Sequence, residues 1–167
     1  MINVNKLLSF LKKEKVTFFS GVPDSVLKST SKVFKKKKIN EHFITANEGS
    51  SVAMGIGYNL ATKKIPCIYM QNSGLGNAIN PLISIAHKKV YSIPMLLMIG
   101  WRGSPGIKDE PQHQIKGKIT LKLLKLLNIK FCILENEKDF KNLKKLINYL
   151  KKKNEQVDFL NKRNDIK

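Results

Sequence analysis

The segment Ile44-Thr45-Ala46-Asn47-Glu48-Gly49-Ser50-Ser51-Val52-Ala53-Met54-Gly55-Ile56-Gly57-Tyr58 joins a short apolar run to a stretch of small residues. The apolar run predicts a strand over 42–46, and the following pattern predicts a helix over 48–62. Glycine inside a helix costs about 1 kcal/mol relative to alanine, so a helix that holds several of them is expected to approach another helix or a ligand closely. The single acid of this segment, Glu48, lies at the start of this helix, next to the surface that is expected to be closely packed.

Outward from this segment, apolar strand-sized runs alternate with helical patterns. The continuous apolar runs predict a parallel sheet with helices on both faces, a three-layer α/β fold. Asp24 or Ser25 is expected to cap the helix that follows the first strand. The other expected strands cover 16–20, 65–71, 94–101 and 130–134, and the other expected helices cover 3–14, 74–86, the turns around Leu121 to Leu127, and 137–152.

The organisation predicts one domain over 1–153 and a polar tail over 154–167, which is rich in Asn and Lys. The segment 102–116 contains Gly, Pro, Asp and Gln and is interpreted as a long loop. In parallel sheets, ligands bind at the carboxyl ends of the strands. Four polar segments fall at such ends, and we expect them to converge there. They are 21–25, 47–50, 71–77 and 101–113.

Composition excludes several classes of protein. The chain has 167 residues, a formal net charge of +19 and 42% apolar residues, which fits one domain with a substantial core. Arginine occurs only at 102 and 163, whereas nucleic-acid readers favour arginine for paired contacts with bases. The lysine runs 35–38 and 151–153 are therefore interpreted as solvated helix faces and ends, with a surface for a polyanion as the alternative.

The same reading favours a cytoplasmic protein. No apolar run reaches the roughly 18 residues of a membrane-spanning helix, and the first residues lack the pattern of a signal peptide. Cys67 and Cys132 stand singly in apolar runs without metal-ligand spacing. Two such thiols fit a reducing compartment better than a disulfide framework.

Four segments in this order resemble the pyrimidine-binding domain of thiamine-diphosphate-dependent decarboxylases. They are Gly21-Val22-Pro23-Asp24-Ser25, Ala46-Asn47-Glu48-Gly49, Tyr69-Met70-Gln71-Asn72-Ser73-Gly74-Leu75-Gly76-Asn77, and Ile99-Gly100-Trp101-Arg102-Gly103 leading to Asp109-Glu110-Pro111-Gln112-His113. Within that family they look most like phosphonopyruvate decarboxylase and the alpha subunit of sulfopyruvate decarboxylase. The resemblance covers about residues 5 to 135 and implies the thiamine-diphosphate-binding fold.

The resemblance implies that Glu48 activates the cofactor by a hydrogen bond to N1′ of its aminopyrimidine, while the cofactor supplies the electron sink. By itself, Glu48 is equally an ordinary first-turn acid that the helix dipole favours. Asp24 is implied as an active-site acid that relays protons, and its alternative is a plain helix cap. His113 is implied as the proton donor after CO2 leaves, with Asp109 and Glu110 as candidates to orient it. The alternative for His113 is a surface side chain.

Cofactor and substrate contacts are implied for the remaining motif residues. The alternative for the 71–77 loop is a turn with a helix cap, and the alternative for Arg102 is a structural ion pair. An arginine at the end of a strand can grip a phosphonate or sulfonate through paired hydrogen bonds. The implied cofactor contacts are Glu48, Gln71, Asn72, Gly74 and Asn77, and the implied substrate contacts are Ser25, Asn72, Arg102 and Gln112.

Family enzymes hold the diphosphate and Mg2+ through a second domain that carries Gly-Asp-Gly, and this sequence contains no Gly-Asp-Gly. We therefore expect no metal ligand here and half of an active site, completed by another subunit of a homo- or hetero-oligomer, or an N-terminal piece of a longer product. The expected reaction is decarboxylation of 3-phosphonopyruvate to phosphonoacetaldehyde. The alternatives are a sulfopyruvate decarboxylase alpha subunit and a non-catalytic binding module built on the same domain.

Overall fold

The computed structural model describes residues 1–36, 41–162 and 165–166. Its centre is a six-stranded sheet in the order β2-β1-β3-β4-β6-β5, and all pairs of neighbouring strands are parallel. The strands are β1 Phe18–Gly21, β2 His42–Ile44, β3 Pro66–Gln71, β4 Met95–Trp101, β5 Lys130–Ile133 and β6 Gln156–Lys162. The predicted parallel α/β fold is confirmed.

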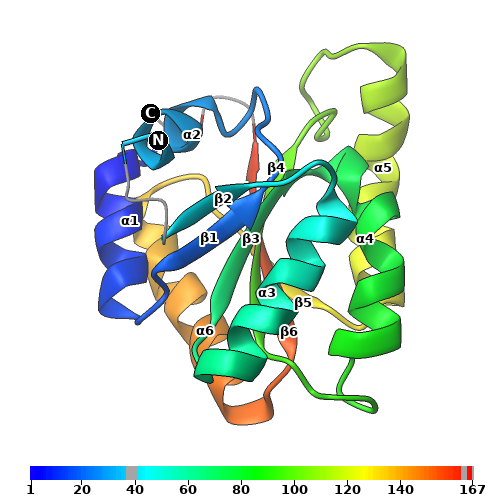
Figure 1. Cartoon of the computed structure of the whole chain (residues 1–167). Coiled ribbons are helices and arrows are strands. Elements are labelled where there is room, and N and C mark those ends of the chain that lie inside the picture. The colour runs from blue at the N-terminus through cyan, green and yellow to red at the C-terminus, as the bar shows by residue number, and fades with distance from the viewer. Residues whose placement is uncertain (37–40, 163–164, 167) are drawn as a thin grey trace.

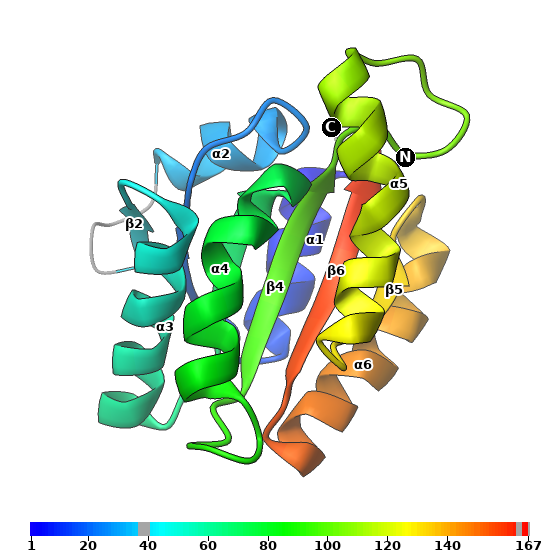
Figure 2. The ribbon, with the colours of Figure 1, turned by 90° about the vertical axis from the view of Figure 1, so that its right-hand side faces the viewer.

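Helices cover both faces of the sheet (Figure 1). Figure 2 shows α4 and α5 on the near side of β4 and β6, α3 to the left beside α4, and α1 and α6 behind the sheet. Each face has its own apolar cluster, one built with α1, α2 and α6 and the other with α3, α4 and α5. The helices are α1 Val4–Lys13, α2 Lys28–Phe34, α3 Glu48–Thr62, α4 Leu75–Pro81 with a π-helical extension Leu82–Ala86, α5 Pro111–Leu126 and α6 Phe140–Lys153.

The decisive segment folds as its sequence indicates. The Asn47 side chain accepts a hydrogen bond of 2.9 Å from the backbone N–H of Ser50 and so begins α3 at Glu48. A side chain at Gly55 would lie 2.7 Å from Ile68, because α3 packs directly on the sheet there. Gly57 faces open space instead. Close approach therefore explains Gly55 and leaves Gly57 unexplained.

The predicted polar tail over 154–167 is wrong for its first half. Residues Gln156–Lys162 form β6, which lies between β4 and β5 and is buried from Gln156 to Asn161. Ile166 then pairs with Ile2, so the two chain ends lie side by side (Figure 1). The polar residues of this strand concealed its alternating apolar positions Val157 and Phe159, which are fully buried. Residues 163, 164 and 167 of the predicted tail lie outside the described residues.

Surface features follow the predictions in part. Lys151, Lys152 and Lys153 are exposed in the last turn of α6, where cations suit the helix dipole. Lys37 and Lys38 of the other run, and Arg163, lie outside the described residues. Cys67 and Cys132 carry free thiols. Within the described part of the chain, no helix is both long and apolar enough to cross a membrane, and no cluster of His, Cys, Asp or Glu is placed to hold a metal ion.

Candidate active site

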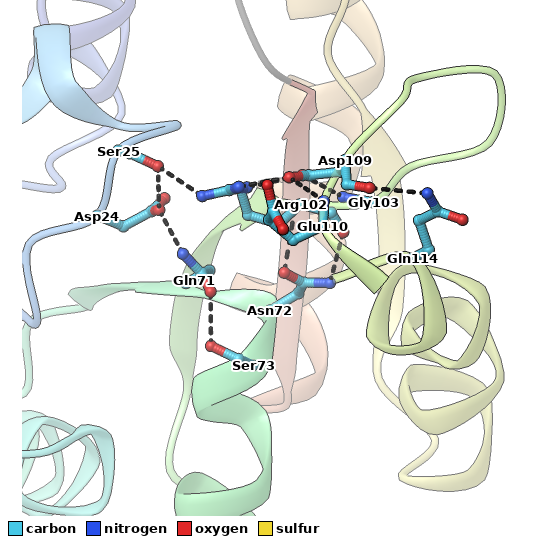
Figure 3. A network of polar contacts seen from close by, with 10 residues as sticks. All are labelled: Asp24, Ser25, Gln71, Asn72, Ser73, Arg102, Gly103, Asp109, Glu110 and Gln114. Atoms are coloured by element: carbon cyan, nitrogen blue, oxygen red, sulfur yellow. Dashed lines mark hydrogen bonds and ion pairs between the residues drawn. The ribbon is translucent and has the colours of Figure 1, made fainter. Parts of the chain in front are cut away.

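The four polar segments converge at the carboxyl edge of the sheet, as the sequence predicts. They follow β1, β2, β3 and β4, which are neighbours in the sheet. Figure 3 shows Asp24, Gln71 and Arg102 approaching one another from the ends of β1, β3 and β4. Side chains more than 70 residues apart in sequence, such as Ser25 and Arg102, are in hydrogen-bond contact there. This edge is the candidate site.

Glu48 occupies the first position of α3 and is half-buried. Its Oε2 accepts a hydrogen bond of 2.8 Å from Nδ2 of Asn77 in α4. The carboxylate lies against Gly74, where a Cβ would stand 2.4 Å from Cγ, Cδ and Oε1 of Glu48. Only glycine therefore leaves room for this carboxylate, and Glu48, Gly74 and Asn77 lie in mutual contact at this edge.

The short 3-10 turn Asn72–Gly74 connects β3 to α4 and holds Asn72 inward. Asn72 Nδ2 donates to Thr120 Oγ1 at 2.8 Å and to the Arg102 carbonyl at 3.0 Å, and Asn72 Oδ1 accepts from the Arg102 N–H at 3.1 Å. The amide thus ties the β3 turn to the end of β4 and to α5. This tethering role was not predicted, and it engages the polar atoms that the cofactor and substrate contacts of Asn72 would need.

Asp24 is held at the edge by two neighbouring strands. Gln71 Nε2 donates to Asp24 Oδ1 at 2.8 Å, and Ser73 Oγ donates to Gln71 Oε1 at 2.8 Å (Figure 3). The other oxygen of Asp24 lies over Gly100 of β4, 2.1 Å from where a Cβ would stand. Leu27 N–H donates to this oxygen at 3.3 Å. The N-cap of α2 is Leu27 and makes no side-chain cap, so the predicted capping by Asp24 or Ser25 is wrong; Asp24 closes the turn before the helix.

Arg102 forms a forked ion pair with Asp109, as the structural alternative for this residue requires. Arg102 Nε donates to Asp109 Oδ2 at 2.7 Å, Nη2 donates to Oδ1, and Nη1 donates to Ser25 Oγ at 3.1 Å. The side chains are 16% and 3% exposed. This hydrogen-bonded pairing raises the pKa of Arg102 and lowers the pKa of Asp109. Asp109 therefore serves Arg102 rather than His113, contrary to the prediction.

The long loop predicted over 102–116 is too long, because α5 already begins at Pro111. Proline suits the first position of a helix, where its missing N–H would have no partner. A side chain at Gly117 would lie 1.8 Å from the Gly103 carbonyl oxygen, so α5 packs tightly on the turn after β4. This contact also places Gly117 O within 3.0 Å of the Trp101 indole N–H, which donates to it.

His113 and Gln112 therefore lie in the first turn of α5, not in a loop. Gln112 is exposed. His113 is half-buried, and its Nδ1 is buried without a hydrogen-bond partner among the described residues. No polar contact described in this structure links His113 to Asp24, Gln71 or Glu48. Its role as a proton donor stays a prediction.

The sequence did not predict the roles of two residues of the site, Asp109 as the partner of Arg102 and Thr120 as the partner of Asn72. Asp109 was visible in the Asp-Glu-Pro-Gln-His motif, and its pairing with the sole arginine before residue 163 could have been suspected from charge alone. Thr120 gave no signal, because a threonine inside a helical pattern carries no mark of its partner Asn72. Glu48, Asp24, Gln71, Gly74 and Asn77 lie at the edge where the sequence predicts them.

Comparisons with known proteins agree with this geometry. The family described as "Thiamine pyrophosphate enzyme, N-terminal TPP binding domain" matches residues 4–123. A phosphonopyruvate decarboxylase of Streptomyces hygroscopicus is 34% identical over 139 residues, which are 83% of this chain and 34% of that protein. The sulfopyruvate decarboxylase subunit alpha of Methanococcus maripaludis is 35% identical over 117 residues, 70% of this chain and 67% of that subunit.

Solved structures share the fold. Benzoylformate decarboxylase from Polynucleobacter necessarius superimposes with a TM-score of 0.73 at 18% identity, over 99% of this chain and 30% of that chain. The chain thus spans about a third of the length of the phosphonopyruvate decarboxylases it matches. The family match covers most of the domain, including every strand from β1 to β4 and the edge that carries Glu48. The chain belongs to the thiamine pyrophosphate enzymes, as a member of their N-terminal TPP-binding domain family.

Proposed function

We propose that this chain supplies the pyrimidine-binding half of a decarboxylase that converts 3-phosphonopyruvate to phosphonoacetaldehyde and CO2. The observation that carries the proposal is the position of the Glu48 carboxylate, which packs against Gly74 and accepts a hydrogen bond from Asn77. Glu48 lies in the first turn of α3, at the carboxyl edge of the sheet. A carboxyl group in that place can hold or accept one proton at a ring nitrogen of a bound aminopyrimidine.

The residues present fit thiamine diphosphate. Gly74 leaves space that the Glu48 carboxylate fills, and Asn77 is the sole described residue that hydrogen-bonds this carboxylate, through Oε2. Oε1 therefore remains for a ligand. Glu48 would hold the ring nitrogen, and Gln71 and Asn77 would flank the ring. When bound, the cofactor supplies the electron sink for the bond to CO2. We assign the Mg2+ ligands to a separate Gly-Asp-Gly domain or subunit.

Arg102 is the proposed anchor of the substrate's anionic group. A guanidinium has five N–H groups, and three of them bond to Asp109 and Ser25. The remaining two are without a partner among the described residues. Asp109 fixes the plane of the guanidinium and so holds the two remaining donors, one on Nη1 and one on Nη2, in that plane. Ser25 stands beside Nη1 and adds a hydroxyl, and the net charge of +19 attracts anions toward the protein.

Asp24 is proposed to move a proton during the reaction. Gln71 fixes one of its oxygens, and its backbone turn places the other over Gly100. His113 is the second candidate for this task, by its position in the first turn of α5. Gln112, exposed in the same turn, remains a proposed substrate contact. The proposed cellular location is the cytoplasm.

A second candidate function is that of a sulfopyruvate decarboxylase alpha subunit. The observation that favours it is the extent of the match, because the chain covers 67% of that subunit but 34% of the phosphonopyruvate enzyme. In that case the partner is a separate subunit. A phosphonate can carry a second negative charge and a sulfonate cannot, so the two substrates differ in how strongly they need Arg102.

The test is reconstitution with a co-expressed polypeptide that carries Gly-Asp-Gly. Thiamine diphosphate and Mg2+ are titrated calorimetrically into the chain alone and into the complex, and CO2 release is measured with 3-phosphonopyruvate and with 3-sulfopyruvate. We expect binding in the complex, and turnover that Glu48→Gln abolishes while urea unfolding shows the variant to be folded. Binding without turnover of either acid would refute the substrate proposal. No binding with any such partner would favour the non-catalytic module.

A further inference from the structure

Asn161 lies in the same row of the sheet as Gln71. The register pairs Gln71 of β3 with Gly100 of β4, and Gly100 with Asn161 of β6. In-register residues of parallel strands project to the same face, so these three positions share one face. It is the face with Phe159 and Val157, covered by α1, α2 and α6. The row ends at the carboxyl edge that holds the candidate site.

The Asn161 side chain is buried and has no hydrogen-bond partner in the described part of the chain. The residue is 0% exposed, and neither Nδ2 nor Oδ1 has a hydrogen-bond partner among the described residues. Buried amides without partners are rare and costly in folded proteins. Asparagine is also disfavoured in strands. An asparagine at this buried position is therefore expected to have a hydrogen-bond partner in solution.

Asp24 lies within reach of this amide. Its Oδ2 occupies the space above Gly100, 2.1 Å from the place of the missing Cβ. Neighbouring strands are about 4.8 Å apart, so the backbone of Asn161 lies roughly that far from Gly100, the residue over which Asp24 Oδ2 lies. Gln71 stands on the opposite side, one strand away, and donates to Oδ1 at 2.8 Å. The carboxylate of Asp24 therefore lies between two amides over a glycine, and one of the amides is bonded to it.

We propose that Asn161 is a positioning residue for Asp24, and that a rotation of its side chain lets Nδ2 donate to Oδ2 opposite the bond from Gln71. Two donors on opposite sides fix the plane of the carboxylate over Gly100. Because Asn161 is fully buried, it acts through Asp24 and does not touch the substrate. Its effect on turnover rests on the proposed decarboxylase function, whereas its link to Asp24 is a property of this chain alone.

The link is tested by a double-mutant cycle on the urea unfolding of the chain, with Asp24→Ala, Asn161→Ala and the double variant. We expect the two changes to be non-additive by about tenfold in the unfolding equilibrium constant, as for a hydrogen bond to a charged group. The Asp24→Ala and Gln71→Ala cycle is the positive control. Asn59, a buried asparagine bonded at 2.9 Å to the Lys64 carbonyl, gives the control cycle in which additivity is expected. Additivity for Asn161 beside coupling for Gln71 would overturn the proposal.

Asn161→Leu provides an independent sign test. Leucine removes the amide at similar size, so the variant is less stable than the wild type if Asn161 bonds to Asp24. An amide without a partner in solution would make the leucine variant more stable instead, and that result would overturn the proposal.

The role in turnover is tested in the reconstituted enzyme. Asn161→Ala is expected to lower kcat at least tenfold with little change in KM, and to add no further loss in an Asp24→Ala background. Unchanged kcat would overturn the positioning role. An inactive wild-type enzyme would instead count against the proposed function, and the unfolding cycle would still decide whether Asn161 and Asp24 are linked.

Discussion

The substitution Gly74→Ala is the most direct test of the contact between the Glu48 carboxylate and residue 74. The glycine has φ −73° and ψ −13°, which any residue adopts, so the substitution adds no backbone strain. Its Cβ would lie 2.4 Å from Cγ, Cδ and Oε1 of Glu48. Because nonbonded carbon atoms prefer about 3.5 Å or more, the carboxylate must move by about 1 Å. The hydrogen bond of 2.8 Å from Asn77 to Glu48 would then lengthen or break.

The energetic cost follows from this displacement. Overpacking costs about 1–3 kcal/mol, and replacing glycine by alanine in a helical conformation returns up to about 1 kcal/mol. We therefore expect a net loss of about 1 kcal/mol in the free energy of unfolding, measured by urea denaturation. In the reconstituted enzyme, moving a proton-handling group by about 1 Å is expected to lower kcat on the order of 100-fold.

Two controls make this prediction sharp. A Cβ at Gly76, two residues further on, meets no atom within 4 Å, so Gly76→Ala is expected to stabilise the chain by up to about 1 kcal/mol. Adding Glu48→Ala to Gly74→Ala removes the clashing side chain and is expected to restore stability. The reasoning is refuted if Gly74→Ala is as stable as Gly76→Ala and fully active, because Glu48 would then not lie over residue 74.

Three further outcomes are expected. Asp109→Asn breaks the forked pair with Arg102 and should lower the free energy of unfolding by about 1–3 kcal/mol near neutral pH. Arg102 lowers the pKa of Asp109 in the folded protein. The stability difference between wild type and variant should therefore shrink as the pH falls below about 4, where the carboxyl of the unfolded chain becomes protonated. Asp158 is fully buried, and neither of its carboxylate oxygens has a well-formed hydrogen bond among the described residues. Burial raises its pKa well above the usual value, and the nearby Phe159 N–H opposes this only weakly. The folded state therefore holds a proton that the unfolded chain releases, and stability falls as the pH rises above about 4, by up to about 1.4 kcal/mol per unit. Asp158→Val should stabilise the chain by about 1–3 kcal/mol at low pH and by more at neutral pH in urea unfolding, while Asp158→Asn should remove the pH dependence. Truncation after Glu155 deletes β6 and should abolish cooperative unfolding by circular dichroism; a folded truncated chain would contradict the place of this strand inside the sheet.

The structure of Arg102 is compatible with both roles that the sequence allowed, a structural ion pair and an anion-binding side chain. It forms a structural ion pair with Asp109, and it still presents two N–H groups that no described residue accepts. An ion pair of this kind orders the arginine before a ligand arrives, which lowers the entropic cost of binding. The structural alternative and the anion-binding hypothesis are thus compatible at this residue.

Local sequence determined much of this protein. The apolar runs and the Asn47 side chain that begins α3 specified the strand-helix unit that carries Glu48, because each depends on residues near one another in the chain. The contacts that require glycine at 49, 55 and 74 are made with residues more than ten positions away. The parallel sheet followed from continuous apolar strands, and the meeting of Asp24, Gln71 and Glu48 at one edge followed from that topology. The α5 boundary was misplaced because polar residues at 109–116 resemble a loop until the contact of Gly117 with Gly103 is known.

Tertiary structure alone decided the rest. The contacts of Asn72 with Thr120, of Arg102 with Ser25 and of Asp24 with Gln71 join residues far apart in sequence, and such hydrogen bonds leave no periodic signal along the chain. The strand β6 shows the same limit most clearly. Its polar residues indicate a tail when the segment is considered by itself. It is buried because it pairs with β4 on one side and with β5 on the other, so that its backbone groups are hydrogen-bonded within the sheet. The same strand pairing places Asn161 of β6 next to Gly100 of β4, over which Asp24 lies, and no local pattern in the sequence could reveal this arrangement.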